Sequence, residues 1–505
     1  MSTVSHNPRD DSVLGTVPDT GPEELAAILA AAAAAGPVLA ATTATRRGEW
    51  IRAVADALDA NTEALVDLAD QETALGRPRL PSELARTTGQ LRYLAAYAES
   101  GAPFEPTIDT ADPAASPTPR PDLRSIRTGI GVVLVFTASN FPFAFGVAGG
   151  DTASAWAAGC PVIVKAHPAH PLLSDAIAEI IRDTLAQRGA PSGMFGLLHG
   201  VDPAVSALRS PAVAAGAFTG SETGGRALHD IAAGRERPIP FFAEMGSVNP
   251  VVITESASTE RPAALAQGLC ESFLLGAGQF CTKPGLIMVP GDSAVPRLLT
   301  ALVADRPAPT MLDKSIRDRH RTGITRLLSR PAVDVVGTGL AAHPTGAGEQ
   351  ISIASVAARE VLAAPELIEE RFGPSTLFVS YESPTELRML LDLLPGSLTG
   401  AVQRGAGEDV RDLVGALAVR AGRVLVDDWP TGVAVTCAQV HGGPYPATTD
   451  ARHTAVGAGA ISRFLRPVAY QNAPDDVLPE WLRDVNPDGV LRRVNGALTV
   501  EEAKR

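Results

Sequence analysis

Between residues 131 and 233, short apolar runs alternate with helical patterns, and this alternation limits the possible folds more than any other feature. Four such pairs of strand and helix cover residues 131–136 and 141–159, 162–165 and 172–187, 193–199 and 203–209, and 213–219 and 222–233. Strands joined by helices at this spacing pair in parallel through right-handed crossovers. The sequence therefore predicts a doubly wound α/β sheet, which binds ligands at the carboxyl ends of its strands.

A second strand and helix series begins at residue 251 and predicts another α/β unit. Helical patterns at 23–35, 46–72 and 81–99 precede the first sheet, and a proline-rich stretch at 102–121 reads as an arm. Residues 460–470 alternate enough to form a strand that pairs outside its own domain. Two α/β domains with an arm are expected.

Composition excludes several classes of function. The net charge of −13, from 56 acidic and 43 basic side chains, argues against nucleic acid as a partner. The four cysteines form no C-x-x-C pair and no histidine stands at metal-ligand spacing, so neither a metal site nor a disulfide framework is indicated. We expect a cytoplasmic protein without a signal peptide or membrane partner, since Gly36 and Pro37 break the apolar run at 25–41.

Polar residues follow three of the predicted strands. Asn140 should open the next helix, where it either caps that helix or points its amide group at a developing oxyanion. Lys165 is either a solvated lysine or a cation for a ribose or phosphate. The sequence Thr219-Gly-Ser-Glu-Thr-Gly-Gly225 is either an ordinary capped turn or a helix start whose NH groups bind pyrophosphate.

One cysteine stands in a glycine-rich loop, Gly276-Ala-Gly-Gln-Phe-Cys-Thr-Lys-Pro-Gly285. Cys281 is therefore either a buried free thiol or a nucleophile that the glycines bring close to a substrate. Glu244 is an isolated acid among apolar residues, where partial desolvation suits a general base. Glu370 could accept two hydrogen bonds from a ribose diol or lie in a charged turn.

In this order and at about this spacing, these motifs resemble the aldehyde dehydrogenase superfamily over about residues 23–470. Five segments resemble the 2,5-dioxovalerate (α-ketoglutaric semialdehyde) dehydrogenases, which form 2-oxoglutarate and usually use NADP. They are Asn140-Phe-Pro-Phe143, Lys165-Ala-His-Pro-Ala-His170, Phe242-Ala-Glu-Met-Gly-Ser-Val-Asn-Pro250, Gly278-Gln-Phe-Cys-Thr-Lys-Pro-Gly285 and His441-Gly-Gly-Pro-Tyr-Pro-Ala-Thr-Thr-Asp450.

The resemblance implies an aldehyde dehydrogenase-like α/β fold, with a Rossmann-type cofactor domain, an α/β catalytic domain and a small β oligomerisation arm. The expected divisions are a mobile tail at 1–20, a dinucleotide-binding domain at 21–104 and 128–243, an arm at 105–127 and 460–480, a catalytic domain at 244–459, and a C-terminal tail at 481–505. A homodimer or homotetramer is expected.

The resemblance also assigns the chemistry. Cys281 would attack the aldehyde carbon, and the Asn140 amide with the Cys281 backbone NH would hold the oxyanion. Glu244 would then activate the water that hydrolyses the thioester. No metal takes part in this scheme.

The expected cofactor-binding residues are Lys165, His167, Gly220, Ser221, Gly225, Gly246, Glu370 and Phe372. NAD-preferring relatives often carry a glutamate three residues after the lysine, where this chain has Pro168 beside His167. The missing carboxylate would remove repulsion of a 2′-phosphate, so NADP is the expected cofactor and NAD remains possible.

A substrate that carries its own carboxylate needs a cation, and Arg86 is a better candidate than Arg92. Phe143 is expected to line the same pocket. Three alternatives remain open: an enzyme for fatty or other semialdehydes, an amide or nitrile hydrolase that uses Cys281, Glu244 and a lysine, and a binding protein without turnover. Activity without cofactor would distinguish the hydrolase.

Overall fold

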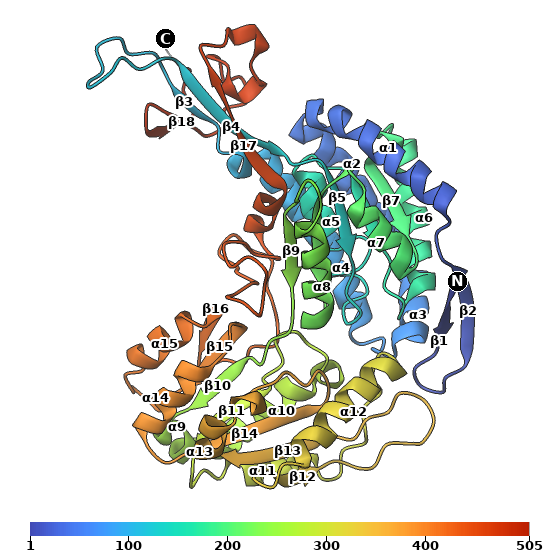
Figure 1. Cartoon of the computed structure of the whole chain (residues 1–505), viewed down its shortest axis with the longest axis vertical. Coiled ribbons are helices and arrows are strands. Elements are labelled where there is room, and N and C mark those ends of the chain that lie inside the picture. The colour runs from blue at the N-terminus through green and yellow to red at the C-terminus, as the bar shows by residue number, and fades with distance from the viewer. Residues whose placement is uncertain (504–505) are drawn as a thin grey trace.

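The computed structural model describes residues 1–503, which form two α/β domains and a thin arm (Figure 1). The first domain, predicted to bind the cofactor and called the cofactor domain below, lies at the upper right in Figure 1. The second, predicted to be the catalytic domain and so called below, lies beneath it. The arm projects at the top, and the strand β9 runs from the first domain toward the second. The predicted fold class is confirmed.

The first sheet is five-stranded, with the order β7-β6-β5-β8-β9 and every neighbouring pair parallel. Its strands are β5 (Val132–Phe136), β6 (Val162–Lys165), β7 (Phe195–Leu198), β8 (Val213–Thr219) and β9 (Phe241–Glu244). The central strand β5 is buried along its whole length, as expected for a parallel sheet with helices on both faces. The doubly wound prediction is therefore correct, and β9 is an additional strand.

Eight helices accompany this sheet: α1 (Pro22–Ala41), α2 (Ala44–Ala60), α3 (Thr62–Thr73), α4 (Leu80–Glu99), α5 (Gly150–Ala157), α6 (Pro171–Gln187), α7 (Val201–Arg209) and α8 (Glu222–Ala233). The prediction of one helix at 141–159 was wrong in its first half. Residues 141–149 form tight turns, in which a Cβ on Gly146 would lie 1.8 Å from the Pro142 carbonyl oxygen. Only residues without side chains allow the backbone to fold back this closely.

The second sheet is seven-stranded, with the order β12-β13-β14-β11-β10-β15-β16. Only the β12–β13 pair is antiparallel. The strands are β10 (Pro250–Ile253), β11 (Leu286–Pro290), β12 (Asp334–Thr338), β13 (Ser352–Ala357), β14 (Ser375–Tyr381), β15 (Ser397–Gln403) and β16 (Ala421–Val426). The helices are α9 (Glu255–Glu260), α10 (Pro262–Leu274), α11 (Val295–Val303), α12 (Lys314–Leu328), α13 (Ala358–Ala363), α14 (Pro384–Leu393) and α15 (Arg411–Ala418).

The arm is a five-stranded sheet of order β17-β4-β3-β18-β19. It consists of β3 (Thr107–Asp109), β4 (Leu123–Gly129), β17 (Leu465–Gln471), β18 (Arg492–Val494) and β19 (Ala497–Thr499). The prediction of a C-terminal tail at 481–505 was wrong over 481–503, because β18 pairs with β3 and Arg492 is fully buried. Its guanidinium donates to the backbone carbonyls of Asp484 and Glu501, which closes this segment on itself. Residues 504 and 505 lie outside the described part.

The prediction of a mobile tail at 1–20 was also wrong. Strands β1 (Ser2–His6) and β2 (Val13–Pro18) form an antiparallel hairpin. The Ser5 hydroxyl donates to the buried Glu72 carboxylate at 2.5 Å, and Glu72 also accepts the NH groups of Leu172 and Leu173 at the start of α6. The turn of the hairpin reaches the catalytic domain, where Pro8 O accepts the NH of Ala347 at 2.7 Å.

Helix α1 continues through Gly36 and Pro37 to Ala41, whereas a break at these residues was predicted. It is the one helix among residues 1–503 that is long and apolar enough to cross a membrane by length and composition alone. In this fold it covers the edge of the first sheet, with Ile28 against Gly196 of β7 and with Ala32, Ala35 and Leu39 buried. Packing against the sheet therefore buries one narrow side of this helix.

Candidate active site

The loop that carries Cys281 connects α10 to β11 through a short turn, Leu275–Gly278. Gly276, Ala277 and Gly278 all have positive φ, between 57° and 70°. A Cβ on Gly278 would lie 2.1 Å from the Gly373 carbonyl oxygen, so only glycine lets these two loops meet. The glycines were predicted to bring the backbone close to a substrate. In the structure, Gly278 instead lets the Cys281 loop pack closely against the loop that contains Gly373.

Two buried side chains hold this loop from beneath. Asn249 donates from Nδ2 to the carbonyl oxygens of Cys281 at 2.7 Å and of Lys283 at 3.0 Å. The Lys283 ammonium donates to the carbonyl oxygens of Arg371 and Ser375 at 2.7 and 2.9 Å. Burial lowers the pKa of Lys283 to about 8. These contacts fix the position of the thiol relative to the segment that contains Glu370.

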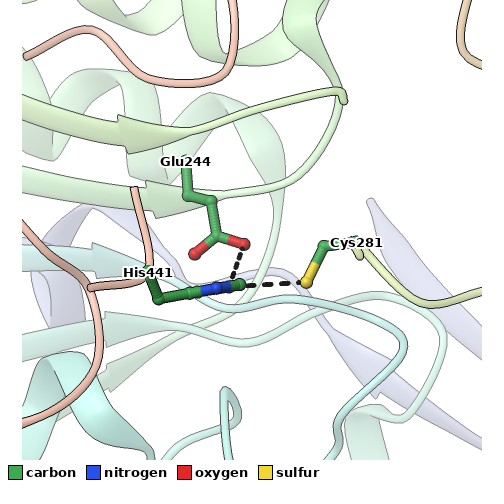
Figure 2. Close-up of side chains that lie close together, drawn as sticks. All are labelled: Glu244, Cys281 and His441. Atoms are coloured by element: carbon green, nitrogen blue, oxygen red, sulfur yellow. Dashed lines mark hydrogen bonds and ion pairs between the residues drawn. The ribbon is translucent and has the colours of Figure 1, made fainter. Parts of the chain in front are cut away.

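Three reactive side chains meet at the end of β9 (Figure 2). Nε2 of His441 lies 3.5 Å from Cys281 Sγ and 2.9 Å from Glu244 Oε1. Glu244 and His441 are almost fully buried, and Cys281 is partly exposed. The His441 backbone is fixed, because its NH donates to Thr454 Oγ1 and its carbonyl accepts the Ala455 NH. The structure thus brings predicted Cys281 and Glu244 together and adds a histidine that contacts both.

Burial raises the pKa of the Cys281 thiol well above its usual range, and the negative charge of Glu244 raises it further. Positive charge comes from Arg86, whose guanidinium is partly desolvated and interacts electrostatically with Cys281 and Glu244. Arg423 on β16 also interacts electrostatically with Cys281. The thiol therefore lies between an acid and two arginines.

Asn140 is buried next to the loop, and its Nδ2 donates to the Gln279 carbonyl oxygen at 2.8 Å. It does not cap a helix, since turns follow it. The Asn140 amide thus contacts the backbone two residues before Cys281.

Aromatic residues line the approach to the thiol. The Phe141 ring lies 4.9 Å from that of Phe280, and the Phe145 ring lies 6.1 Å from His441. The prediction for Phe143 was wrong, because its side chain is buried in the core of the cofactor domain. A helix would have put residues 141 and 145 on one face and residue 143 on another. The tight turn also directs the Phe143 side chain away from those of Phe141 and Phe145.

The two candidate arginines have different surroundings. Arg86 stacks over Phe145 at 5.8 Å, and no hydrogen bond or ion pair within residues 1–503 involves its guanidinium. Arg92 forms ion pairs with Asp56 and Asp59 at 2.6 and 2.7 Å on the exposed side of α4. The helix thus turns Arg86 toward the site and Arg92 away from it.

The predicted cofactor residues of the first domain lie at or after the carboxyl ends of its strands, whereas Glu370 and Phe372 precede β14. Burial lowers the pKa of Lys165, at the end of β6, to about 8, and its ammonium has no hydrogen-bond or ion-pair partner within residues 1–503. His167 accepts the Ala169 NH at Nδ1, and burial lowers its pKa well below the usual range. A neutral ring with Nε2–H can donate a hydrogen bond to a ligand.

The turn after β8 shows an ordinary cap. Ser221 Oγ accepts the Gly224 NH at 3.2 Å, so its hydroxyl stabilises the first turn of α8. Gly225 makes room for Met245, since a Cβ there would lie 2.7 Å from Met245 Sδ. Gly220 and the exposed first NH groups of α8 remain the predicted position for a pyrophosphate.

Glu370 reaches the loop after β9, where a Cβ on Gly246 would lie 2.6 Å from its Oε2. Gly246 is therefore required so that this carboxylate can approach. Burial raises the pKa of Glu370 to about 7. Phe372, two residues later, packs against the turn at Ala277.

His441 was not predicted as a functional residue, although the segment that begins with it resembles the family. A histidine before two glycines gives no periodic signal, and it is 160 residues from Cys281 along the chain. Arg423 was missed because it stands inside a strand pattern. Its Nη1 and Nη2 donate to the carbonyls of Gly432 and Pro430.

Three comparisons with known proteins agree with this geometry. The aldehyde dehydrogenase family profile matches residues 2–336. α-Ketoglutaric semialdehyde dehydrogenase 2 of Azospirillum brasilense is 45% identical over 457 residues, covering 89% of this chain and 87% of that protein. The α-ketoglutaric semialdehyde dehydrogenase of Acinetobacter baylyi is 40% identical over 463 residues, covering 91% and 88%.

A solved structure of a putative aldehyde dehydrogenase from Burkholderia cenocepacia superposes with a TM-score of 0.79 at 20% identity, covering 95% of this chain and 96% of that one. The fold, the family profile and relatives at 40–45% identity all indicate the same protein class. The chain belongs to the aldehyde dehydrogenase family and is an enzyme that oxidises aldehydes with a nicotinamide dinucleotide.

Proposed function

We propose that this enzyme oxidises 2,5-dioxopentanoate to 2-oxoglutarate with NADP as the hydride acceptor. The observation that carries the substrate is Arg86, a half-buried guanidinium that forms no ion pair within residues 1–503 and that interacts electrostatically with Glu83, Cys281 and Glu244. The substrate has an aldehyde at one end and a carboxylate at the other. The names of the two relatives at 40–45% identity refer to the same compound class.

A partly desolvated guanidinium makes charge-assisted, bidentate hydrogen bonds to a carboxylate, each stronger than a neutral one. Arg86 is not occupied by another residue, so no internal ion pair must break when the carboxylate binds. The Phe145 ring beneath it keeps the guanidinium plane in place. Arg86 would thereby orient the substrate with its aldehyde toward the thiol.

In the proposed reaction Cys281 Sγ attacks the aldehyde carbon, and the Asn140 amide with the Cys281 NH stabilises the oxyanion. A donor of this kind contributes about 2.7–4 kcal/mol. A bound dinucleotide would supply the hydride acceptor, and loss of the hydride from the thiohemiacetal would leave a thioester on Cys281. Glu244 then removes a proton from the attacking water, and the acid leaves the sulfur.

Three features support NADP. Lys165 presents an ammonium without an internal partner, His167 can donate from Nε2, and Pro168 brings no carboxylate that would repel a 2′-phosphate. Glu370 would bind the second ribose and Phe372 would pack near the nicotinamide. NAD is the alternative cofactor, bound through the same residues with the ribose hydroxyl in place of the phosphate.

We also propose that the enzyme is a homodimer or a homotetramer assembled through the arm, in the cytoplasm. Strand β17 pairs with β4 on one side only, so its other edge offers unpaired NH and CO groups to a second strand. Truncation after Gly459 should reduce the size of the particle in light scattering. A truncated protein of unchanged size and folding would contradict assembly through β17.

The substrate is tested by following NADPH and NADH formation with 2,5-dioxopentanoate, succinic semialdehyde, glutaraldehyde and a long alkanal. The Arg86→Gln substitution should raise KM for the dioxo acid by about 10–100-fold, the value of one charge-assisted contact, and leave KM for the alkanal unchanged. Arg92→Gln is the matched control on the same helix and should change neither.

Preference of the wild type for the long alkanal would instead indicate a fatty aldehyde dehydrogenase. Reduction of NAD at a higher kcat/KM than NADP would contradict the proposed cofactor. If Arg86→Gln lowered the activity toward the dioxo acid and toward the alkanal equally, this arginine would support the fold and would not select the substrate.

A further inference from the structure

In the proposed reaction, the two donors that hold the oxyanion come from different domains. Asn140 follows β5 of the first sheet, and Cys281 precedes β11 of the second. Such donors act only when each lies about 2.7–3.1 Å from the oxyanion. The spacing of these two donors therefore depends on contacts across the domain boundary. One such contact is the bond from Asn140 Nδ2 to the Gln279 carbonyl oxygen, 139 residues along the chain.

Arg79 lies across the same boundary. It immediately precedes α4, and its mostly buried guanidinium donates from Nη2 to the Asn140 carbonyl oxygen. Its Cζ lies 4.5 Å from the centre of the Phe141 ring and 4.9 Å from the centre of the Phe280 ring. Phe141 follows Asn140 in the chain, and Phe280 precedes Cys281. One side chain thus contacts both segments that carry the oxyanion donors.

The guanidinium also reaches the turn before the thiol. A Cβ on Gly276 would lie 2.8 Å from Arg79 Nη1, so the glycine makes room for the guanidinium. Nη1 is buried and has no hydrogen-bond partner within residues 1–503. A buried donor without a partner lowers stability, and stability alone would favour an apolar side chain at this place.

Glu83, one turn later on α4, fixes the other side of this arrangement. Its carboxylate is almost fully buried, and Oε2 pairs with Arg79 Nη2 at 3.2 Å. Oε1 accepts the NH groups of Phe143 at 2.9 Å and of Ala144 at 3.2 Å. Burial raises the pKa of Glu83, whereas the charge of Arg79 and the two backbone bonds lower it. The start of α4 thus anchors the turn after Asn140 at both of its ends.

We propose that Arg79 is a positioning residue for the oxyanion site. It fixes the distance between the Asn140 amide and the Cys281 NH by holding the two segments that carry them. It acts through Asn140 and Phe280, and the planar guanidinium suits this place because it can stack on rings and donate at its edge. The inference deepens the proposed function and rests on it through the role given to Asn140.

The test is a double-mutant cycle between Arg79→Met and Asn140→Ala. It is measured as kcat and KM with the aldehyde and the dinucleotide that the wild type uses best. Methionine fills much of the same space but has neither charge nor NH groups. A displacement of about 1 Å at a reacting group can cost about 100-fold, so Arg79→Met should lower kcat by about 10–100-fold. KM should change little.

In the Asn140→Ala background, the same substitution should have a much smaller effect, because the amide that Arg79 positions is then absent. The alkylation of Cys281 by iodoacetamide forms no oxyanion, so its rate should be unchanged in Arg79→Met. Peptide mass mapping must report Cys281 by itself, since Cys437 is exposed.

Arg47→Met is the matched control. Arg47 is a buried arginine of the same domain that donates to the carbonyls of Thr42 and Ala157 and lies over the Phe104 ring at 5.8 Å. Its loss should lower the free energy of unfolding and leave kcat unchanged. If Arg79→Met does not fold, Arg79→Lys takes its place in the cycle, since lysine keeps the charge but loses the stacking plane.

An unchanged kcat in the Arg79 variant would overturn the proposal. An equal fall of kcat with and without the Asn140 amide would also overturn it, since Arg79 would then act on the fold in general. So would a slower alkylation of Cys281, because the arginine would then act on the thiol itself. Preference of the wild type for another aldehyde or for NAD would change the proposed function and leave the outcome of this cycle unaffected.

Discussion

Two buried lysines, Lys165 at the end of β6 and Lys283 beneath the Cys281 loop, have the same residue type and the same pKa of about 8, but different partners. Lys283 donates to two backbone carbonyls and connects the thiol loop to the segment before β14. Lys165 makes no such bond within residues 1–503. A buried cation that is hydrogen-bonded internally stabilises the fold, whereas one without partners is available to a ligand.

The largest effect should come from Lys283→Met. The substitution leaves the carbonyls of Arg371 and Ser375 unpaired in the interior, and each lost bond to a charged group costs about 1.5–3 kcal/mol. We expect the free energy of unfolding to fall by about 3–6 kcal/mol. Chemical unfolding followed by tryptophan fluorescence measures it.

Lys314→Met is the control, because Lys314 is an exposed lysine paired with Asp11, and such pairs contribute about 0–1 kcal/mol. If both substitutions lowered the free energy of unfolding equally, the hydrogen bonds of Lys283 to backbone carbonyls would not contribute more than an exposed ion pair.

Lys165→Met should have the opposite result: unchanged or higher stability, but weaker cofactor binding. Loss of one charge-assisted bond to a 2′-phosphate corresponds to about 1.5–3 kcal/mol, or roughly 10–150-fold in Kd. Fluorescence titration with NADP and NAD measures both affinities. A stability loss as large as that of Lys283→Met would show that Lys165 has internal partners.

The smallest effect is a pH dependence. Because burial lowers the pKa of Lys165 to about 8, its ammonium is present below that pH and is lost above it. The affinity for NADP should therefore fall above about pH 8, by at most tenfold per pH unit. Glu370, with a pKa raised to about 7, titrates below this window.

In Lys165→Met the NADP affinity should be flat over the same range. A decline that persists in this variant would assign the titration to another group and would weaken the contrast between the two lysines.

The parallel sheet of the cofactor domain was predicted from sequence almost strand by strand. Its strands are unbroken apolar runs such as Val132–Phe136, and each begins and ends at local turn signals. The two ends of the chain were wrongly predicted to be tails, because their strands lack such an apolar pattern. β1 and β18 are short and mostly polar, and contacts with distant partners, Glu72 and β3, stabilise them.

The residues predicted for the site divide in a similar way. Cys281, Glu244 and Asn140 became candidates because each interrupts an apolar pattern or follows a strand, and the family resemblance assigned their roles. The structure brings them close together. Phe143 was assigned to the pocket from its place in a motif. The backbone at 141–145 directs the Phe143 ring into the core, as a helix would also have done, and leaves Phe141 next to Phe280 and Phe145 near His441.

The sequence by itself determined the two α/β domains, the thiol loop and the polar residues at the strand ends, because these depend on local periodicity and on neighbouring residues. Only the tertiary structure decided that His441 contacts both Cys281 and Glu244, and that Lys283 is bonded internally while Lys165 is not. These contacts join residues up to 197 positions apart, and local patterns carry no information about such pairs. Whether a buried charge supports the fold or awaits a ligand depends on which carbonyls the folded chain brings within reach.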